Sequence, residues 1–179
     1  MRIIGGRLKG IRLNPPASLP VRPTTDMAKE ALFNILYNRF DFEQITVLDL
    51  FSGTGNISLE FASRGVPEIV SVDKSFGCFQ YLKNTAKSLD LTALHAVKAD
   101  VLKFLKQHSG SYDIIFADPP YDLPQLPQLP QLVFEKILLK PEGILILEHP
   151  STIKVDHYPQ FQEQRKYGYS SFSIFGYAG

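Results

Sequence analysis

Short apolar runs alternate with longer segments of helical periodicity along most of this chain, and this alternation limits the possible folds. The apolar runs have the length of strands and are apolar on both faces, which is typical of strands covered on both sides. Such strands, separated by helices, predict a parallel sheet in an α/β fold. The expected strands are residues 46–50, 68–73, 94–99, 112–117 and 144–148, and the helices between them are 57–64, 75–89, 101–107 and 132–139.

The two ends of this alternating region carry different patterns. Residues 26–40 predict a helix, since apolar residues recur there at helical spacing after the candidate caps Thr25 and Asp26. Two aromatic-rich segments flank Gly168 within residues 161–177 and predict an antiparallel hairpin at the sheet edge. At 179 residues, 44% of them hydrophobic, the chain is expected to form one α/β domain with a small N-terminal appendage.

The N-terminal segment differs from the rest in charge. The chain has a net charge of +1, but no acidic residue precedes Asp26, so residues 1–25 carry +5 and the remainder carries −4. Its glycines and prolines predict turns between short strands, followed by an extended arm. A solvated tail and an arm that contacts nucleic-acid phosphates both fit this composition. The basic residues are Arg2, Arg7, Lys9, Arg12 and Arg22.

A Leu-Pro-Gln triplet occurs three times in succession from Leu123. A proline at every third position argues against a helix and predicts polyproline II. The segment is either a connector or a strip that binds a partner.

Gly53 and Gly55 follow the first predicted strand and open the next helix. They allow a tight turn whose backbone amides face a ligand. The third glycine of the dinucleotide fingerprint is replaced by Ser58, which argues against a nicotinamide oxidoreductase.

Carboxylates end the next two strands. Asp73 follows Gly55 by 18 residues, a position from which it can accept both hydroxyls of a ribose. Asp100 ends the third strand and is followed by Val101. This pair is suited to meet an adenine, although Asp100 is equally suited to cap a helix. Together these residues predict an adenosine-binding crevice that requires no phosphate.

Asp118-Pro119-Pro120-Tyr121 follows the fourth strand. The prolines hold an extended loop rigid, so carbonyl oxygens and the Asp118 carboxylate can accept hydrogen bonds from an amino group on a planar ring. Tyr121 can stack on the ring's face. A rigid turn with a buried tyrosine is the alternative, which a position beside an adenosine crevice disfavours.

This tetrapeptide resembles the Asp/Asn-Pro-Pro-Tyr/Phe motif of class I S-adenosylmethionine-dependent methyltransferases that modify amino groups of adenine, guanine or glutamine. Residues 2–10 and 22–36 are similar to the RsmD family, whose members methylate the N2 amine of a guanine in 16S ribosomal RNA. The resemblance implies a Rossmann-like fold: a mostly parallel seven-stranded sheet, helices on both faces, an antiparallel C-terminal hairpin and a small N-terminal hairpin. It divides the chain into an arm, residues 1–25, and a methyltransferase domain, residues 26–179.

The resemblance also implies roles for individual residues. Met27 stands where the family commonly has an arginine, which removes one RNA contact. S-adenosylmethionine is expected at Asp49, Phe51, Gly53, Gly55, Asn56, Asp73, Lys74, Asp100 and Val101. The target guanine is expected at Asp118, Pro119, Pro120 and Tyr121, and RNA is expected at Arg2, Arg7, Lys9, Arg12, Arg22 and Thr24, with Arg165 and Lys166 as further contacts.

We therefore expect a cytoplasmic, monomeric methyltransferase that acts on ribosomal RNA, within a small-subunit particle, without a metal or a membrane. The four histidines have no ligand spacing, and the single cysteine, Cys78, fits a reducing compartment. The alternatives are an adenine-N6 or glutamine-N5 methyltransferase and a non-catalytic nucleotide-binding or RNA-binding α/β module. The basic arm disfavours a protein substrate, and the intact Asp118–Tyr121 loop disfavours the module.

Overall fold

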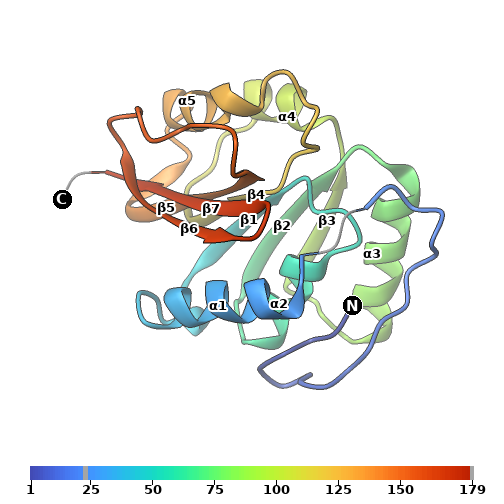
Figure 1. Ribbon diagram of the computed structural model, residues 1–179. Helices are drawn as coiled ribbons and strands as arrows, with labels where there is room; N and C mark the ends of the chain where they lie inside the picture. The colour runs from blue at the N-terminus through green and yellow to red at the C-terminus, as the bar shows by residue number, and fades with distance from the viewer. Residues whose placement is uncertain (22–23, 178–179) are drawn as a thin grey trace.

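The computed structural model describes residues 1–21 and 24–177. They form a seven-stranded sheet in the order β3-β2-β1-β4-β5-β7-β6, with helices on both faces (Figure 1). The predicted Rossmann-like fold is confirmed. The strands are β1 Thr46–Leu50, β2 Glu68–Asp73, β3 Leu94–Lys98, β4 Tyr112–Ala117, β5 Leu139–Pro150, β6 Phe161–Tyr167 and β7 Ser170–Gly176. The helices are α1 Asp26–Tyr37, α2 Asn56–Ser63, α3 Phe76–Ser88, α4 Val101–Gln107 and α5 Leu129–Glu135, with short 3₁₀ turns η1 Phe42–Gln44 and η2 Leu126–Gln128.

Strands β1 to β5 pair in parallel, and β7 and β6 extend the sheet in antiparallel fashion. The predicted C-terminal hairpin at the sheet edge is therefore confirmed. The carboxyl ends of β1, β2, β3 and β4 lie at one edge, because parallel neighbours share a direction.

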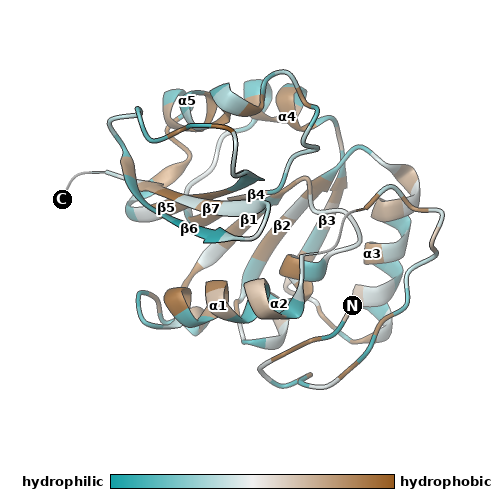
Figure 2. Cartoon of the chain, in the orientation of Figure 1, coloured by the Kyte–Doolittle hydropathy of each residue, from teal (hydrophilic) through white to brown (hydrophobic). Residues whose placement is uncertain are grey.

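Two apolar clusters cover the two faces of the sheet. One lies under α1, α2 and α3 and includes Leu32, Phe33 and Leu82; the other lies under α4 and α5 and includes Leu105 and Val133. Figure 2 shows the apolar character of the central strands and the more polar edge strand β6. This burial on both faces explains why the central strands lack a polar alternation.

The prediction of polyproline II for the Leu-Pro-Gln repeat is wrong. Residues 126–128 form η2 and α5 begins at Leu129, with Pro127 and Pro130 within the first two positions of these elements. The first residues of a helix have no intrahelical partner for their N–H groups, so proline is tolerated there. Leu126 and Leu129 are fully buried, and their burial favours the helical turns.

The expected short strands at the N-terminus are reduced to a single antiparallel bridge between Arg2 and Arg12. The backbone N–H groups of Ile4 and Gly5 donate instead to the carboxylate of Glu60 on α2, at 2.9 Å each. These donors are therefore not available for a longer ladder, and the segment folds onto α2.

Candidate active site

A cavity of about 770 Å³ lies at the carboxyl ends of β1, β2 and β4. This edge of the sheet is where α/β proteins of this topology bind ligands. Gly55 is the only residue of the predicted cofactor and guanine sets that does not line the cavity. The residues that do are Asp49, Phe51, Gly53, Asn56, Asp73, Lys74, Asp100, Val101, Asp118, Pro119, Pro120 and Tyr121.

The turn after β1 has a left-handed backbone at three positions. Gly53 has a φ of 56° and Gly55 a φ of 93°, and a Cβ on Gly55 would lie 2.3 Å from the Leu82 side chain. A glycine is therefore required at position 55, because the Leu82 side chain packs closely against it. Phe51 has a φ of 58°, a conformation that is strained for an aromatic residue and is found mainly at functional sites.

Asp73 holds this turn in place. Its Oδ2 accepts a hydrogen bond from the Gly53 amide at 2.9 Å, and its Oδ1 accepts one from the Ser75 amide at 2.8 Å. Each carboxylate oxygen has further acceptor capacity for a ligand hydroxyl.

Asp100 caps α4 by accepting from the Lys103 amide at 3.1 Å, and it also lines the cavity. The two interpretations of Asp100 are therefore compatible, since only Oδ1 takes part in the cap.

Asp49 is a buried carboxyl group at the end of β1, 1% exposed. Ser58 donates to its Oδ2 at 2.5 Å, and the Ser58 hydroxyl also bonds that of Ser71 at 2.6 Å. Burial raises the pKa of Asp49 to about 7, against the opposing effect of the Ser58 hydrogen bond. Ser58, where a dinucleotide fingerprint would have glycine, thus holds an acidic side chain in this protein.

The Asp118–Tyr121 loop closes another side of the cavity. The Asp118 amide donates to the Leu50 carbonyl at 3.4 Å, and Pro119 is buried while Pro120 is exposed. The Tyr121 hydroxyl forms a hydrogen bond of 2.5 Å with Ser170, the first residue of β7. The C-terminal hairpin therefore helps to fix the loop, a contact for which the sequence gives no signal.

The N-terminal segment forms a further wall that the sequence did not predict. Leu19 and Val21 line the cavity, where Leu19 packs on Gly77 and Val21 packs on Gly53. Thr24 also lines the cavity, and its hydroxyl donates to Glu148 Oε1 at 2.9 Å.

The basic residues of this segment lie in different surroundings. Arg7, Lys9 and Arg12 are exposed and do not line the cavity, whereas Arg2 forms an ion pair of 3.1 Å with Asp26. Arg22 lies outside the described residues.

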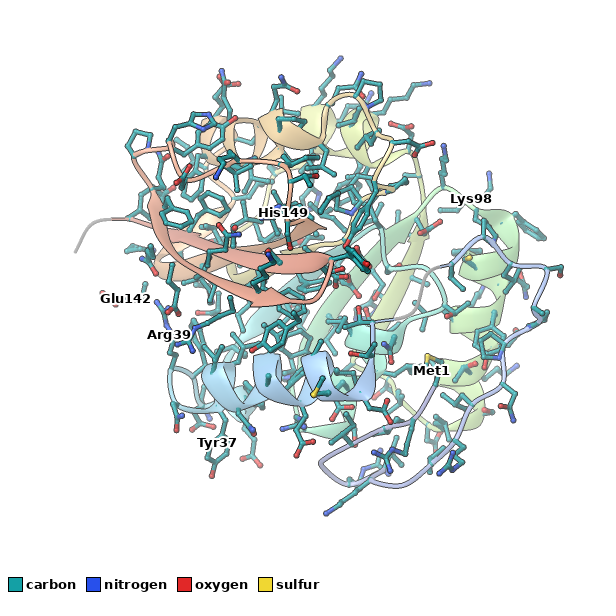
Figure 3. The ribbon with its side chains drawn as sticks, viewed as in Figure 1. Met1, Tyr37, Arg39, Lys98, Glu142 and His149 are labelled. Atoms are coloured by element: carbon teal, nitrogen blue, oxygen red, sulfur yellow. The ribbon has the colours of Figure 1, made fainter. Side chains whose placement is uncertain are left out.

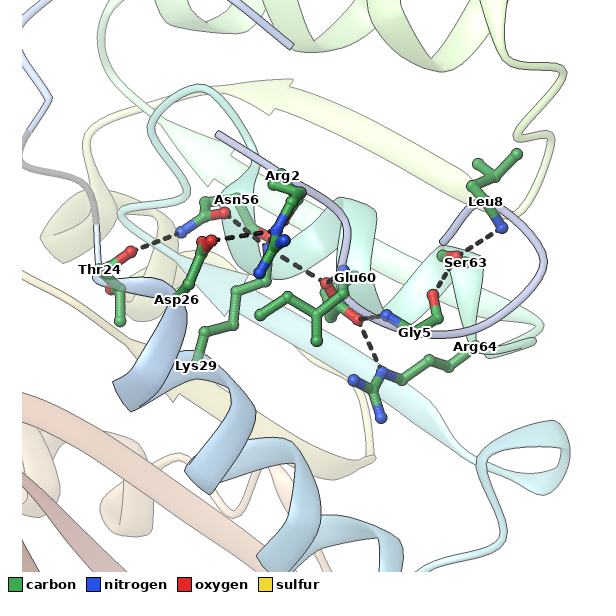
Figure 4. A network of polar contacts seen from close by, with 11 residues as sticks. Arg2, Gly5, Leu8, Thr24, Asp26, Lys29, Asn56, Glu60, Ser63 and Arg64 are labelled. Atoms are coloured by element: carbon green, nitrogen blue, oxygen red, sulfur yellow. Dashed lines mark hydrogen bonds and ion pairs between the residues drawn. The ribbon is translucent and has the colours of Figure 1, made fainter. Parts of the chain in front are cut away.

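A buried ionic network anchors the N-terminal segment beneath the cavity (Figure 4). Lys29 and Glu60 are 1% and 0% exposed, and their charged groups lie 3.1 Å apart. Lys29 Nζ also donates to the Arg2 carbonyl and to Asn56 Oδ1, each at 2.8 Å, and Arg64 donates to Glu60 at 2.8 Å. The network thus joins the N-terminal segment, α1 and the first residue of α2.

Burial lowers the pKa of Lys29, and the nearby Glu60 carboxylate opposes this effect. The pKa of Glu60 is lowered, because hydrogen bonds from Ile4, Lys29 and Arg64 outweigh the opposing effect of burial. Lys29 is spaced as an ordinary helix residue, so its burial was not evident from the sequence.

Comparison with known families gives a match over nearly the whole chain. The family described as Conserved hypothetical protein 95 matches residues 1–176. The chain belongs to this family, the RsmD family. Ribosomal RNA small subunit methyltransferase D of Escherichia coli K12 is 31% identical over 148 residues, which cover 83% of this chain and 74% of that protein. YlbH of Bacillus subtilis is 35% identical over 167 residues, 87% of this chain and 85% of YlbH.

Among solved structures, a hypothetical protein of Thermus thermophilus is similar to this RsmD-family chain with a TM-score of 0.86 and 29% identity, covering 99% of both chains. Within the described part of the chain, no helix is both long and apolar enough to span a bilayer. The described residues contain no cluster of three His, Cys, Asp or Glu side chains placed to hold a metal ion.

Proposed function

We propose that this protein transfers a methyl group from S-adenosylmethionine to the exocyclic N2 amine of a guanine in small-subunit ribosomal RNA. The observation that carries the proposal is that the Asp118–Tyr121 loop lines the same cavity as Asp49, Asp73 and Asp100. One cavity therefore offers acceptors for an amine beside acceptors for a nucleoside. The name of the E. coli relative, ribosomal RNA small subunit methyltransferase D, supports this function and the S-adenosylmethionine-dependent methylation of ribosomal RNA in general.

The residues present suit S-adenosylmethionine. The cavity, at about 770 Å³, falls in the range of about 300–1,000 Å³ typical of small-molecule sites. In the proposed arrangement, Asp73 accepts the ribose hydroxyls, Asp100 and Val101 meet the adenine, and Asp49 faces the cationic methionine end. No phosphate-binding group is required, which agrees with the missing third glycine.

When bound, S-adenosylmethionine supplies an electrophilic methyl group carried on a positively charged sulfur. The chain's own contribution is to orient the amine and localise its lone pair, which the guanine ring otherwise delocalises. Asp118 and the loop carbonyl oxygens accept hydrogen bonds from the N–H groups of the guanine amine, and Tyr121 stacks on the base. After transfer the amine nitrogen is acidic, and in this proposal Asp118 or water accepts its proton.

RNA binding is assigned to residues 1–25, as an arm on the methyltransferase domain of residues 26–179. The target base must leave its stack to enter the cavity, at a cost of about a few kcal/mol that backbone contacts offset. Arg7, Lys9 and Arg12 are exposed cations that suit this role. Arg2, with its side chain 43% exposed, is paired with Asp26 and is assigned to shaping the arm.

The test is methylation of 16S ribosomal RNA and of small-subunit particles with labelled S-adenosylmethionine, followed by mass spectrometry of the nucleosides. We expect N2-methylguanosine. Formation of N6-methyladenosine instead would replace the proposed substrate and keep the methyltransferase class.

Variants of the loop test the assigned role of Asp118. We expect Asp118→Ala and Asp118→Asn to lower the rate by about 100-fold or more while S-adenosylhomocysteine still binds. Asp122→Ala, which removes an exposed carboxylate that also lines the cavity, is the matched control and should remain close to wild type. Equal loss of methylation and cofactor binding in Asp118→Ala would show that Asp118 serves the cofactor.

A further inference from the structure

The turn between β6 and β7 presents an aromatic side chain to solvent. Tyr169 is 94% exposed, more than any other large apolar or aromatic side chain among the described residues. A fully exposed aromatic side chain contributes little to folding, and the face of its ring is open to a partner.

This turn is firmly held. The Ser151 amide donates to the Tyr169 carbonyl at 2.9 Å, and the Ser151 hydroxyl reaches the Gly168 carbonyl at 3.4 Å. Tyr167 packs edge-on against Phe172, with ring centroids 5.7 Å apart. Tyr169 therefore stands on a rigid support, which lowers the entropy lost when a partner binds.

The turn also lies beside the loop proposed to hold the target base. Ser170, the residue after Tyr169, bonds the Tyr121 hydroxyl at 2.5 Å and pairs with Pro150 at the carboxyl end of β5. In Figure 1 the ends of β5 and β6 and the start of β7 meet at the edge of the sheet to which β4 points. A nucleotide next to a base held by Tyr121 would therefore be near Tyr169.

Two exposed cations precede the turn on β6. Arg165 and Lys166 are neighbours near the end of that strand, so their side chains point to opposite faces just before the turn. Arg165 forms a solvent-exposed ion pair of 3.3 Å with Glu163, which is weak enough to be exchanged for a phosphate. Exposed aromatic rings close to cations are features that proteins use to bind unpaired nucleotides.

We propose that the β6–β7 turn binds a nucleotide of the RNA that flanks the target guanine. The base stacks on Tyr169, and Arg165 and Lys166 contact the adjoining phosphates. This inference rests on the proposed function, and it makes the C-terminal hairpin a second RNA-binding surface, separate from the basic residues of the N-terminal segment.

The experiment compares three variants in binding to transcribed 16S ribosomal RNA and in methylation of it. Tyr169→Ala should weaken RNA binding by about 5-fold to about 100-fold, the range found for the loss of one base–aromatic stack, whereas Tyr169→Phe should bind as wild type does. Tyr37→Ala is the matched control, because Tyr37 is 71% exposed and projects from the far end of α1 (Figure 3). S-adenosylhomocysteine affinity should not change in any of them, and the melting temperature should not change in either Tyr169 variant.

The outcomes separate the two proposals. If wild type methylates RNA and Tyr169→Ala binds RNA as tightly as wild type, the inference is overturned and the proposed function stands. Equal weakening by Tyr37→Ala and Tyr169→Ala would also overturn it, since a site-specific contact would then be absent. If wild type binds RNA but methylates neither 16S ribosomal RNA nor small-subunit particles, the proposed function fails, and the binding comparison still decides the role of Tyr169.

Discussion

The N-terminal segment lines the cavity and the C-terminal hairpin holds the Tyr121 side chain of its wall, but the two are attached to the protein in different ways. The hairpin is joined to β5 by an antiparallel ladder that runs from Ile144 to Pro150, so many backbone hydrogen bonds share its attachment. The bridge between Arg2 and Arg12 lies within the N-terminal segment itself. The segment is attached to the protein by a backbone hydrogen bond from Arg7 to Ser63 and above all by the side chains of Glu60 and Lys29. A ladder tolerates most single substitutions, whereas a buried ionic network depends on every one of its members.

The largest expected effect is at the centre of that network. Glu60→Gln leaves the buried ammonium of Lys29 without its countercharge, and we expect it to lower the free energy of unfolding by about 3–5 kcal/mol. Urea denaturation measures this change. The pKa of Glu60 is lowered in the folded protein, so the wild type should lose this contribution only as the pH falls through that lowered value.

The hairpin supplies the control. Glu163→Gln removes the corresponding charge from an exposed ion pair, and it should change the free energy of unfolding by at most about 0.5 kcal/mol. Similar effects of the two substitutions would mean that both segments are attached in the same way.

The next effect concerns RNA. Replacing Arg7, Lys9 and Arg12 together by alanine should weaken RNA binding by roughly tenfold or more and reduce the dependence of log affinity on log salt by about 2 to 3. These side chains are exposed, so the melting temperature should change little. Binding assays across a salt series measure both quantities.

A triple alanine variant of the exposed Lys103, Lys106 and Lys136 is matched in charge and lies on α4 and beyond α5. If its salt dependence falls as much as that of the N-terminal variant, the effect reflects net charge alone, and the N-terminal segment has no special role.

A further effect should appear at Asp49, on the cavity wall. The pKa of Asp49 is about 7 in the folded protein, above the ordinary value of 3.8, so the folded state binds more protons than the unfolded state between these values. Stability should therefore fall as the pH rises from about 4 to about 7, and Asp49→Asn should remove that part of the dependence. Melting temperatures of both proteins measured from pH 5 to pH 8 test this. If melting temperature depends on pH in the same way in both proteins, the raised pKa of Asp49 is contradicted.

The smallest effect is expected at Ser170, where the hairpin contacts the Asp118–Tyr121 loop. Ser170→Ala removes the hydrogen bond to Tyr121 and should cost about 0.5–1.5 kcal/mol in stability. If Ser170 positions Tyr121, kcat should fall while the KM for S-adenosylmethionine is unchanged, and Ser170→Thr should restore the rate. A loss of stability with an unchanged kcat would show a structural role only.

Most of the fold could be predicted because the central strands carry their own pattern. The predicted ranges 46–50, 68–73 and 112–117 coincide with β1, β2 and β4. These strands are largely buried on both faces, and a mostly apolar run without polar alternation records that burial. The Leu-Pro-Gln repeat was mispredicted since the expected effect of proline on a helix interior was applied to residues that lie in first turns.

Some residues of the candidate site could be predicted from the sequence and others could not. Residues at strand ends, such as Asp73, Asp100 and Asp118, could be found because the order of strands in an α/β fold brings their carboxyl ends together. The cavity wall formed by Leu19 and Val21, the Glu60 network and the Ser170 contact could not be found, because each joins residues far apart in sequence whose local patterns are ordinary.

The sequence by itself determined the sheet, the glycine turn, the acidic strand ends, the loop after β4 and the separation of charge near residue 25. These features are recorded in local spacing, which depends on the backbone geometry of strands and turns. Only the tertiary structure decided that the N-terminal segment is a wall of the cavity and that the C-terminal hairpin holds Tyr121. Both depend on the position that each segment takes in the folded protein. That position is determined by contacts between residues far apart in sequence, such as those of Lys29, Glu60 and Ser170, and not by the segment's own composition.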